Sequence, residues 1–263
     1  MLLKDQVAII TGGATGMGRG IALRFAEEGA HIAIADINKV KAEETIEDVQ
    51  SKGRKGIAVE CNITSGVAVS AMIKKVADEF NRIDILVNCA GTTAGTAGGS
   101  SVAEIGEEEW DRILAVNLKG AFLFIKGVIP HMKNRKYGRI VNISSLGAFS
   151  PPTVSPHYHA AKAGIIGMTY DTAREVGPFN IRVNAIMPGP IRTPFYDKLV
   201  DSMTEDEKNA FFERLGREAP LQRMGTPEDI AGAALFLVSD LSAYVTAAVI
   251  PVSGGLPLEA PSR

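Results

Sequence analysis

Short apolar runs recur along the chain, and a helical pattern follows nearly every one of them. Examples are residues 7–11 (VAIIT), 31–36 (HIAIAD) and 83–88 (IDILVN). Such uninterrupted runs suit strands that are buried on both faces, as the strands of parallel sheets are. Because these strands alternate with helices, we predict right-handed βαβ units and an α/β fold: a doubly wound parallel sheet between two helical layers.

The rest of the chain continues this alternation. Helices are expected at residues 39–52, 66–80, 110–133, 156–177 and 227–238, and further strands at 56–60, 138–144, 181–186 and 247–252. At about 194–219, charged residues mix with aromatic and aliphatic ones, which predicts an amphipathic helical excursion. It would be either a lid over the substrate or a plain surface hairpin of helices. Without a repeat or a linker, 263 residues fit a single domain.

Composition argues against several classes of protein. The net charge of −2 gives no indication of nucleic-acid binding. No segment has the roughly 18 uninterrupted apolar residues of a membrane span, and the first apolar run is too short for a signal peptide. Cys61 and Cys89 lack the spacing of a metal site. We therefore expect no membrane partner, no metal, reduced thiols and a cytoplasmic location.

A glycine-rich turn, TGGATGMG, follows the first predicted strand and precedes a helix. It contains Gly12, Gly16 and Gly18. A strand, a glycine turn and a helix together bring backbone N–H groups and a helix N-terminus up to a pyrophosphate. The turn alone is weak evidence, because many strand-to-helix connections contain glycine.

Asp36 ends the second predicted strand. An acidic side chain at this position accepts both hydroxyls of an adenosine ribose and repels a 2′-phosphate. Neither Thr15 in the turn nor Ile37 after the aspartate supplies the positive charge that a 2′-phosphate favours. We therefore predict NAD rather than NADP as the cofactor. The alternative is that Asp36 only caps the next helix.

Tyr158 and Lys162 are the candidates for acid–base chemistry. Ser155-Pro156 is typical of a helix start, so these two side chains, four residues apart, project from one helix face. A phenol titrates near ~10, and a nearby ammonium and a helix N-terminus favour its ionised form, so we expect a lowered pKa for Tyr158. Ser145 could donate a hydrogen bond to the same substrate oxygen. The group suits proton exchange with an alcohol or a ketone.

Seven motifs, taken in order, resemble the short-chain dehydrogenase/reductase family over nearly the whole chain. They are TGGATGMG, Asp36, NCAG at 88–91, Asn117, Ser145, YHAAK at 158–162 and PGPIRT at 188–193. The resemblance implies one NAD-binding Rossmann-type domain over residues 1–263, and an oxidoreductase that interconverts a secondary alcohol and a ketone. It also implies a homotetramer, or a homodimer, built on the two long helices.

Residue roles follow from the same resemblance. Tyr158 would be the general acid/base, Lys162 would lower its pKa and bind the nicotinamide ribose, and Ser145 would orient the substrate oxygen. Asn117 would hold a water in a proton relay. The cofactor would contact the residues that match the family's binding motifs: Gly12, Thr15, Gly16, Met17, Gly18, Asp36, Ile37, Asn62, Ile63, Asn88, Ala90, Gly91, Tyr158, Lys162, Pro188, Gly189, Ile191 and Thr193. The substrate would contact Ser145, Tyr158 and a mainly apolar wall: Phe149, Val154, Phe195 and Tyr196.

Two positions depart from the family pattern. Cys89 replaces the second residue of the usual Asn-Asn-Ala-Gly, and Asn62 replaces the usual acidic residue at the adenine end of the third strand. The carbonyl oxygen of Asn62 can still pair with the adenine amino group. His157 and His159 flank Tyr158 and are expected on other helix faces, in packing or surface roles.

Asp36 also bears on the substrate. Relatives that reduce 3-oxoacyl chains on acyl carrier protein usually take NADPH and often carry a basic residue where this chain has residues 177–180, GPFN. We therefore favour a small-molecule secondary alcohol of hydroxyacyl-CoA type, or an alicyclic or other hydrophobic alcohol. The acyl-carrier-protein reductase is the alternative, and a non-catalytic NAD-binding sensor is a more distant one.

Overall fold

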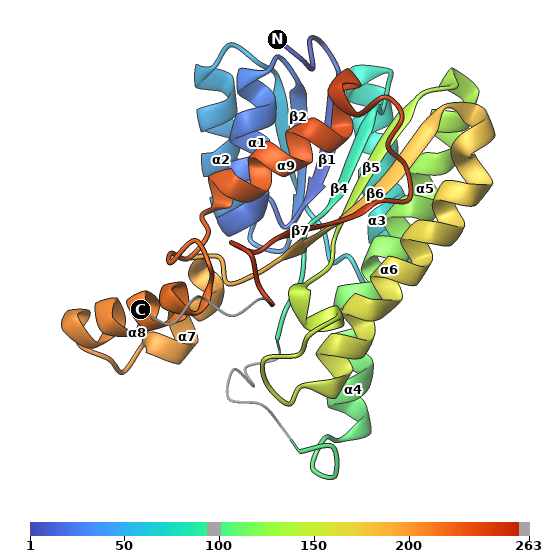
Figure 1. Cartoon of the computed structure of the whole chain (residues 1–263). Helices are drawn as coiled ribbons and strands as arrows, with labels where there is room; N and C mark the ends of the chain where they lie inside the picture. Colours follow the sequence, from blue (N-terminus) through green and yellow to red (C-terminus); the bar gives the residue numbers. More distant parts are fainter. Residues whose placement is uncertain (94–100, 258–263) are drawn as a thin grey trace.

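The computed structural model describes residues 1–93 and 101–257. Seven parallel strands form one sheet in the order β3-β2-β1-β4-β5-β6-β7 (Figure 1). Their bounds are β1 Val7–Thr11, β2 His31–Asp36, β3 Gly56–Glu60, β4 Ile85–Asn88, β5 Gly138–Ile143, β6 Ile181–Pro188 and β7 Val249–Val252. The predicted doubly wound sheet is confirmed. Its strand order changes direction between β1 and β4, which is where such sheets bind ligands.

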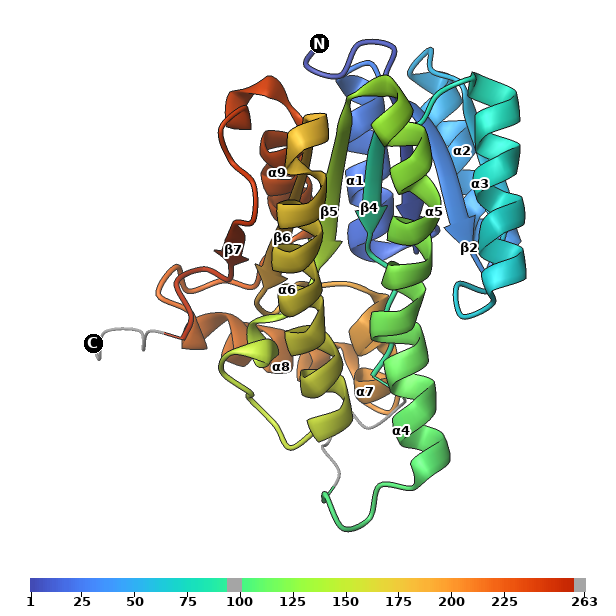
Figure 2. The same cartoon turned by 90° about the vertical axis from the view of Figure 1, so that its right-hand side faces the viewer.

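Helices cover both faces of the sheet, as Figure 2 shows. One layer contains α1 (Gly16–Glu27), α2 (Lys39–Ser51) and α9 (Pro227–Val238); the other contains α3 (Gly66–Phe80), α5 (Gly120–Arg135) and α6 (Pro156–Val176). Successive strand residues serve the two cores in turn: Ile10 packs into the first and Ile9 into the second. Because both faces are buried, the strands carry no polar face, and this explains their uninterrupted apolar runs.

The helix expected at 110–133 has three parts. They are α4 (Glu107–Leu114), a π-helical segment (Ala115–Lys119) and α5. Asn117 lies in the π-helical segment, a form that is frequent at functional sites. The continuous helical stretch Glu107–Arg135 is long and apolar enough to cross a membrane. Core helices of soluble proteins can have the same length and composition. Here α5 packs against α3 and α6.

The helical excursion near 194–219 is present in the structure. It consists of a 3₁₀ turn (Pro194–Tyr196), α7 (Asp197–Val200) and α8 (Glu205–Glu218). Thr204 and Glu207 form a capping box that fixes the start of α8. In both views α7 and α8 lie beyond the same end of the sheet as α4 (Figures 1 and 2).

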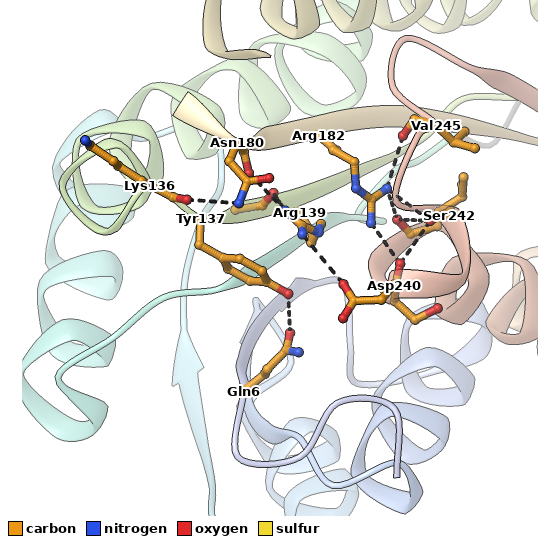
Figure 3. A network of polar contacts seen from close by, with 12 residues as sticks. Gln6, Lys136, Tyr137, Arg139, Asn180, Arg182, Asp240, Ser242 and Val245 are labelled. Atoms are coloured by element: carbon orange, nitrogen blue, oxygen red, sulfur yellow. Dashed lines mark hydrogen bonds and ion pairs between the residues drawn. The ribbon is translucent and has the colours of Figure 1, made fainter. Parts of the chain in front are cut away.

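At the opposite, amino edge of the sheet, Arg182 ties β6 to the segment after α9 (Figure 3). Its side chain is 6% exposed. The guanidinium donates hydrogen bonds of 2.8–3.1 Å to the carbonyls of Leu237, Ser239 and Val245 and to the hydroxyl of Ser242. One buried cation therefore satisfies acceptors that this irregular segment would otherwise leave without partners.

Arg139 lies directly opposite Arg182 in the β5–β6 register and is also buried. It donates to the Asn180 carbonyl at 3.0 Å, and its guanidinium carbon lies 4.0 Å from the centroid of the Tyr137 ring (Figure 3). The exposed Asp240 carboxylate lies 3.9 Å from its NH2 group. The amino edge is thus held by two arginines that bind mostly backbone carbonyls.

Candidate active site

The glycine turn adopts a backbone conformation that favours glycine. Gly12 and Gly16 have φ of +68° and +53°, a region that side-chain-bearing residues rarely adopt. A Cβ on Gly12 would lie 2.8 Å from the Cα of Ala90, so the turn packs directly against the segment after β4. Thr15, the N-cap of α1, makes no side-chain capping bond, so the first N–H groups of α1 lack a capping side chain.

Asp36 is held at the rim of this turn. Its carboxylate accepts hydrogen bonds from the Ala14 N–H at 3.0 Å and from the Asn38 N–H at 2.9 Å. The cap of α2 is Asn38, whose side chain accepts from the Lys41 N–H. The alternative that Asp36 caps this helix is therefore wrong.

At the predicted adenine end, Asn62 already has local partners. Its side-chain oxygen accepts from the N–H and the hydroxyl of Thr64, at 3.0 and 2.8 Å. An adenine amino group would have to share this oxygen, which two donors occupy. Of the two predicted neighbours, Ile63 is buried and Ile37 is exposed.

Two loops meet at the glycine turn. Thr11 Oγ1 accepts from the N–H groups of Cys89 and Ala90, which fixes the segment after β4. A Cβ on Gly16 would lie 3.3 Å from the side chain of Thr193, so the loop after β6 also reaches the turn. Among the predicted residues of that loop, Ile191 is buried, and the Gly189 N–H donates to the Val252 carbonyl at 3.0 Å.

Lys162 lies at the carboxyl edge with its side chain 4% exposed. The ammonium donates to the Ile143 carbonyl at 3.0 Å and lies 5.7 Å from the centroid of the Tyr158 ring. Ser144 Oγ donates to the Lys162 carbonyl at 2.7 Å, which fixes α6 to the end of β5. Burial lowers the pKa of Lys162 to about 8.

Tyr158 and Ser145 are brought together as predicted. Ser145 Oγ accepts from the Gly147 N–H at 3.1 Å, inside a short 3₁₀ turn (Leu146–Ala148), and it also hydrogen-bonds Tyr158. The helix start is correct in position, with Pro156 as the first residue, but Ser155 makes no side-chain capping bond.

The expected lowering of the Tyr158 pKa is wrong for this structure. Burial raises the pKa of Tyr158, and the Ser145 hydrogen bond opposes that rise only in part. The sequence identified the neighbouring ammonium, but it gave no measure of how much water the fold removes from the phenol.

Asn117, in the π-helical segment, lies close to Lys162. Its amide nitrogen donates to the carbonyls of Thr92 and Ile113, and its oxygen accepts from the Thr92 N–H. A Cβ on Gly91 would lie 2.9 Å from the Asn117 oxygen and 3.4 Å from the Lys162 nitrogen. The amide and the ammonium therefore border one small space, which only a glycine leaves open.

Comparison with known proteins identifies the family. Residues 12–257 match a family model described as enoyl-(acyl carrier protein) reductase. The chain is 41% identical to the (2S)-[(R)-hydroxy(phenyl)methyl]succinyl-CoA dehydrogenase subunit BbsD of Thauera aromatica, covering 98% of this chain and 99% of that protein. It is 38% identical to the 3-oxoacyl-[acyl-carrier-protein] reductase FabG of Thermotoga maritima, covering 97% and 99%.

Solved structures agree with the sequence matches. Levodione reductase superposes with a TM-score of 0.88 at 31% identity, covering 96% of this chain and 97% of that one. NAD⁺-bound xylitol dehydrogenase superposes with a TM-score of 0.87 at 30% identity, covering 97% and 100%. The chain belongs to the short-chain dehydrogenase/reductase family. It is accordingly an oxidoreductase that acts on an alcohol or a ketone.

In this short-chain dehydrogenase/reductase, the predicted substrate wall is only partly enclosed. Tyr196 is half-buried, and burial raises its pKa to about 12, with the charge on Tyr158 a smaller contribution. Tyr196, at the start of the excursion, therefore lies near Tyr158. Phe149, by contrast, is 74% exposed, and Val154 and Phe195 are exposed as well.

The sequence did not predict a chain of hydrogen bonds between buried polar side chains next to the site. Asn88 Nδ2 donates to Asn142 Oδ1 at 2.8 Å, and Asn142 Nδ2 donates to Thr169 Oγ1 at 3.0 Å. The Asn88 oxygen has no hydrogen-bond partner among the described residues. Asn142 interrupts an apolar strand, and this interruption was the one available signal. Residues 1–93 and 101–257 contain no cluster of ligands that could hold a metal.

Proposed function

We propose that the protein is an NAD(H)-dependent oxidoreductase that interconverts a secondary alcohol and a ketone, with Tyr158 as the general acid/base. The supporting observation is that Tyr158, Ser145 and Lys162 converge at the carboxyl edge of β5, beside the glycine turn of β1. Proton exchange requires a titratable group within hydrogen-bond reach of the reacting oxygen, and the phenol and the serine hydroxyl can contact one oxygen together.

The residues at this edge fit a dinucleotide. The first turn of α1 offers N–H groups without a capping side chain, and the glycine turn leaves room for a close approach. Asp36 supports NAD over NADP, because its carboxylate is fixed at the rim by two backbone N–H groups and would repel a 2′-phosphate. Met17, Gly18, Pro188 and Thr193 complete the proposed binding surface.

The mechanism assigns one task to each side chain. Ser145 donates to the substrate oxygen, since its own oxygen is already oriented by the Gly147 N–H. Tyr158 takes the hydroxyl proton during oxidation and returns it during reduction. Lys162 carries positive charge that favours the phenolate. A bound nicotinamide cofactor would supply the hydride chemistry at the carbon that bears this oxygen.

Asn117 would connect the site to solvent. Its amide is held on the Thr92 and Ile113 backbone, next to the Lys162 ammonium. A water bound there would pass the proton between Lys162 and bulk solvent.

We further propose a hydroxyacyl-CoA-type, alicyclic or other hydrophobic secondary alcohol as substrate. The relative from Thauera aromatica, named as acting on a succinyl-CoA derivative, supports the first of these. The FabG relatives support the second candidate, 3-oxoacyl-[acyl-carrier-protein] reductase. A panel of alcohols and acyl thioesters, followed by NADH absorbance, would separate the two; reduction of acyl-carrier-protein substrates with NADPH alone would favour the FabG activity.

The assembly and location are proposals as well. Large side chains on the outer surfaces of α5 and α6, Phe122 and Tyr170, are exposed, which supports a homotetramer or a homodimer through these helices. Mass measurement in solution tests the oligomeric state.

Cys61 and Cys89 are both free, in agreement with a cytoplasmic location. The excursion formed by α7 and α8 would serve as the substrate lid, and residues 1–263 would form one NAD-binding domain.

Tyr158→Phe tests the catalytic assignment. The variant removes one oxygen, so NADH binding should persist while kcat falls by roughly 10²- to 10⁴-fold. Normal turnover by this variant would refute the assignment.

Asp36→Ala tests the cofactor choice, because the preference for NADH over NADPH should relax. A wild-type protein that binds NADPH more tightly than NADH would overturn that choice.

A further inference from the structure

His159 lies closer to the reacting groups than its sequence position suggests. It follows Tyr158 on α6, and the helix was expected to direct it to a packing or surface role. The two rings meet edge to face, with centroids 5.7 Å apart and an interplanar angle of 70°. The 3₁₀ turn that carries Ser145 folds back over α6, so the imidazole contacts this turn as well.

The contact with the turn is made by the Nε2 edge of the ring. A Cβ on Gly147 would lie 2.7 Å from His159 Cδ2 and 2.8 Å from His159 Nε2. The same point lies 3.4 Å from Ser145 Oγ. The imidazole nitrogen and the serine oxygen therefore border one position, and only a glycine at 147 leaves room for the ring.

The ring nitrogens of His159 are available for a ligand. Among residues 1–93 and 101–257, no group hydrogen-bonds either of them, and the side chain is half-buried. Burial lowers the pKa of His159, and the neighbouring His157 lowers it further. A neutral imidazole has one donor and one acceptor, so it suits an uncharged oxygen such as a carbonyl or a hydroxyl.

We propose that His159 is a substrate-positioning residue that hydrogen-bonds a second, uncharged oxygen near the carbinol carbon. The proposal rests on the oxidoreductase function proposed above and makes its substrate class more specific: an alcohol with a neighbouring hydroxyl or carbonyl. The walls named above, Phe149 and Val154, are apolar, so a polar nitrogen beside Ser145 would discriminate between substrates with and without that oxygen.

Two matched substrate pairs test the proposal and show whether the second oxygen belongs to a hydroxyl or to a carbonyl group. Cyclohexanol is compared with trans-1,2-cyclohexanediol for the hydroxyl, and 2-pentanol with methyl 3-hydroxybutanoate for the carbonyl. In His159→Phe, which keeps a ring against Gly147, the ratio of kcat/KM within at least one pair should fall by roughly 3- to 10-fold, the effect of one lost hydrogen bond. The pair that responds identifies the oxygen.

His159→Leu is measured in parallel, so that the test does not depend on one variant folding. His159→Gln, whose amide nitrogen can occupy the Nε2 position, should restore the ratio. Equal losses for both members of each pair, with no rescue by glutamine, would reduce His159 to a packing residue and overturn the inference alone. If the wild type binds NADH but oxidises neither these four compounds nor any alcohol or acyl thioester of the panel above, the proposed function fails, and the inference fails with it.

Discussion

Both edges of the sheet bury cations, and these cations differ in how many of their hydrogen-bond donors have partners. At the amino edge, Arg182 donates to four acceptors of its own chain. At the carboxyl edge, the ammonium of Lys162 has three donors, and within the described part of the chain one of them reaches an acceptor, the Ile143 carbonyl. Burial lowers the pKa of both groups, to about 10 for Arg182 and about 8 for Lys162.

The number of bonded donors suggests that Arg182 contributes mainly to stability and Lys162 mainly to function. A buried cation most of whose donors bind the chain's own acceptors, as the two terminal nitrogens of Arg182 do, holds the fold together. A buried cation with several spare donors carries a desolvation cost that a ligand can offset. We therefore expect substitutions at the two edges to act on different measurable quantities.

Lys162→Met should produce the largest effect, and the effect should be on turnover. Without the ammonium, the phenolate of Tyr158 loses its stabilising charge, so kcat should fall by roughly 10³-fold, about 4 kcal/mol. The free energy of unfolding at pH 7 should be unchanged or higher, because an under-bonded buried charge is removed. Steady-state kinetics and urea unfolding measure the two quantities. Lys133→Met, at a surface ion pair with Glu175, is the matched control and should leave kcat unchanged.

Arg182→Met should produce the reverse pattern. The carbonyls of Leu237, Ser239 and Val245 lose their donor, so the free energy of unfolding should fall by about 3 kcal/mol. The turnover of the folded fraction should stay close to wild type, because the substitution lies at the other edge. Arg174→Met, on the exposed side of α6, is the control. A variant as stable as wild type would show that the amino-edge hydrogen bonds contribute little.

Alkaline pH should reveal the cost of burying Lys162. Its pKa in the folded protein, about 8, lies below its ordinary value of 10.5, so the unfolded chain binds the proton more strongly. Stability should therefore rise between pH 8 and 10.5, by about 3 kcal/mol at most, and this gain should be absent in Lys162→Met. Urea unfolding of both proteins across that range measures it. Parallel stability curves would mean that the ammonium is better solvated than its burial indicates.

The smallest expected effect concerns the ion pair between Arg223 and Asp229 at the start of α9. The hydrogen bond from Arg223 lowers the pKa of Asp229 to about 2. A carboxyl group whose pKa is lowered by folding stabilises the fold at pH values above its pKa in the unfolded chain, about 3.9. This contribution is lost as pH falls toward 2. Because the pair is largely exposed, Arg223→Met should lower Tm at pH 7 by about 2 °C or less. The difference from wild type should shrink as pH falls toward 2.

The sequence predicted the fold to within a few residues at most element ends, because buried strands and capped helices have local signatures. Pro156 and Asn38 mark helix starts in the chain itself. The partners of Arg182 lie more than 50 residues away, and no local pattern could identify them. An arginine within an apolar strand was the only sign of that network.

The same limit applies to the candidate site. Asp36, Ser145, Tyr158 and Lys162 could be identified from motifs, and the structure brings the last three together. The direction of the Tyr158 pKa could not be predicted, because it depends on burial by segments distant in sequence. The position of His159 depends on how the turn after β5 folds back, and helical spacing alone does not contain that information.

The π-helical segment Ala115–Lys119 has a consequence for how this chain tolerates insertions and deletions. An α-helix turns by about 100° per residue, and a π turn holds one additional residue. Deleting a single residue there would convert the segment into ordinary α-helix and leave the apolar surface of α5 in register. It would also rotate Asn117 away from Thr92 and Lys162. Such a deletion would yield a well-folded protein in which the proposed proton route through Asn117 is interrupted, so an intact fold by itself does not guarantee a working member of this family.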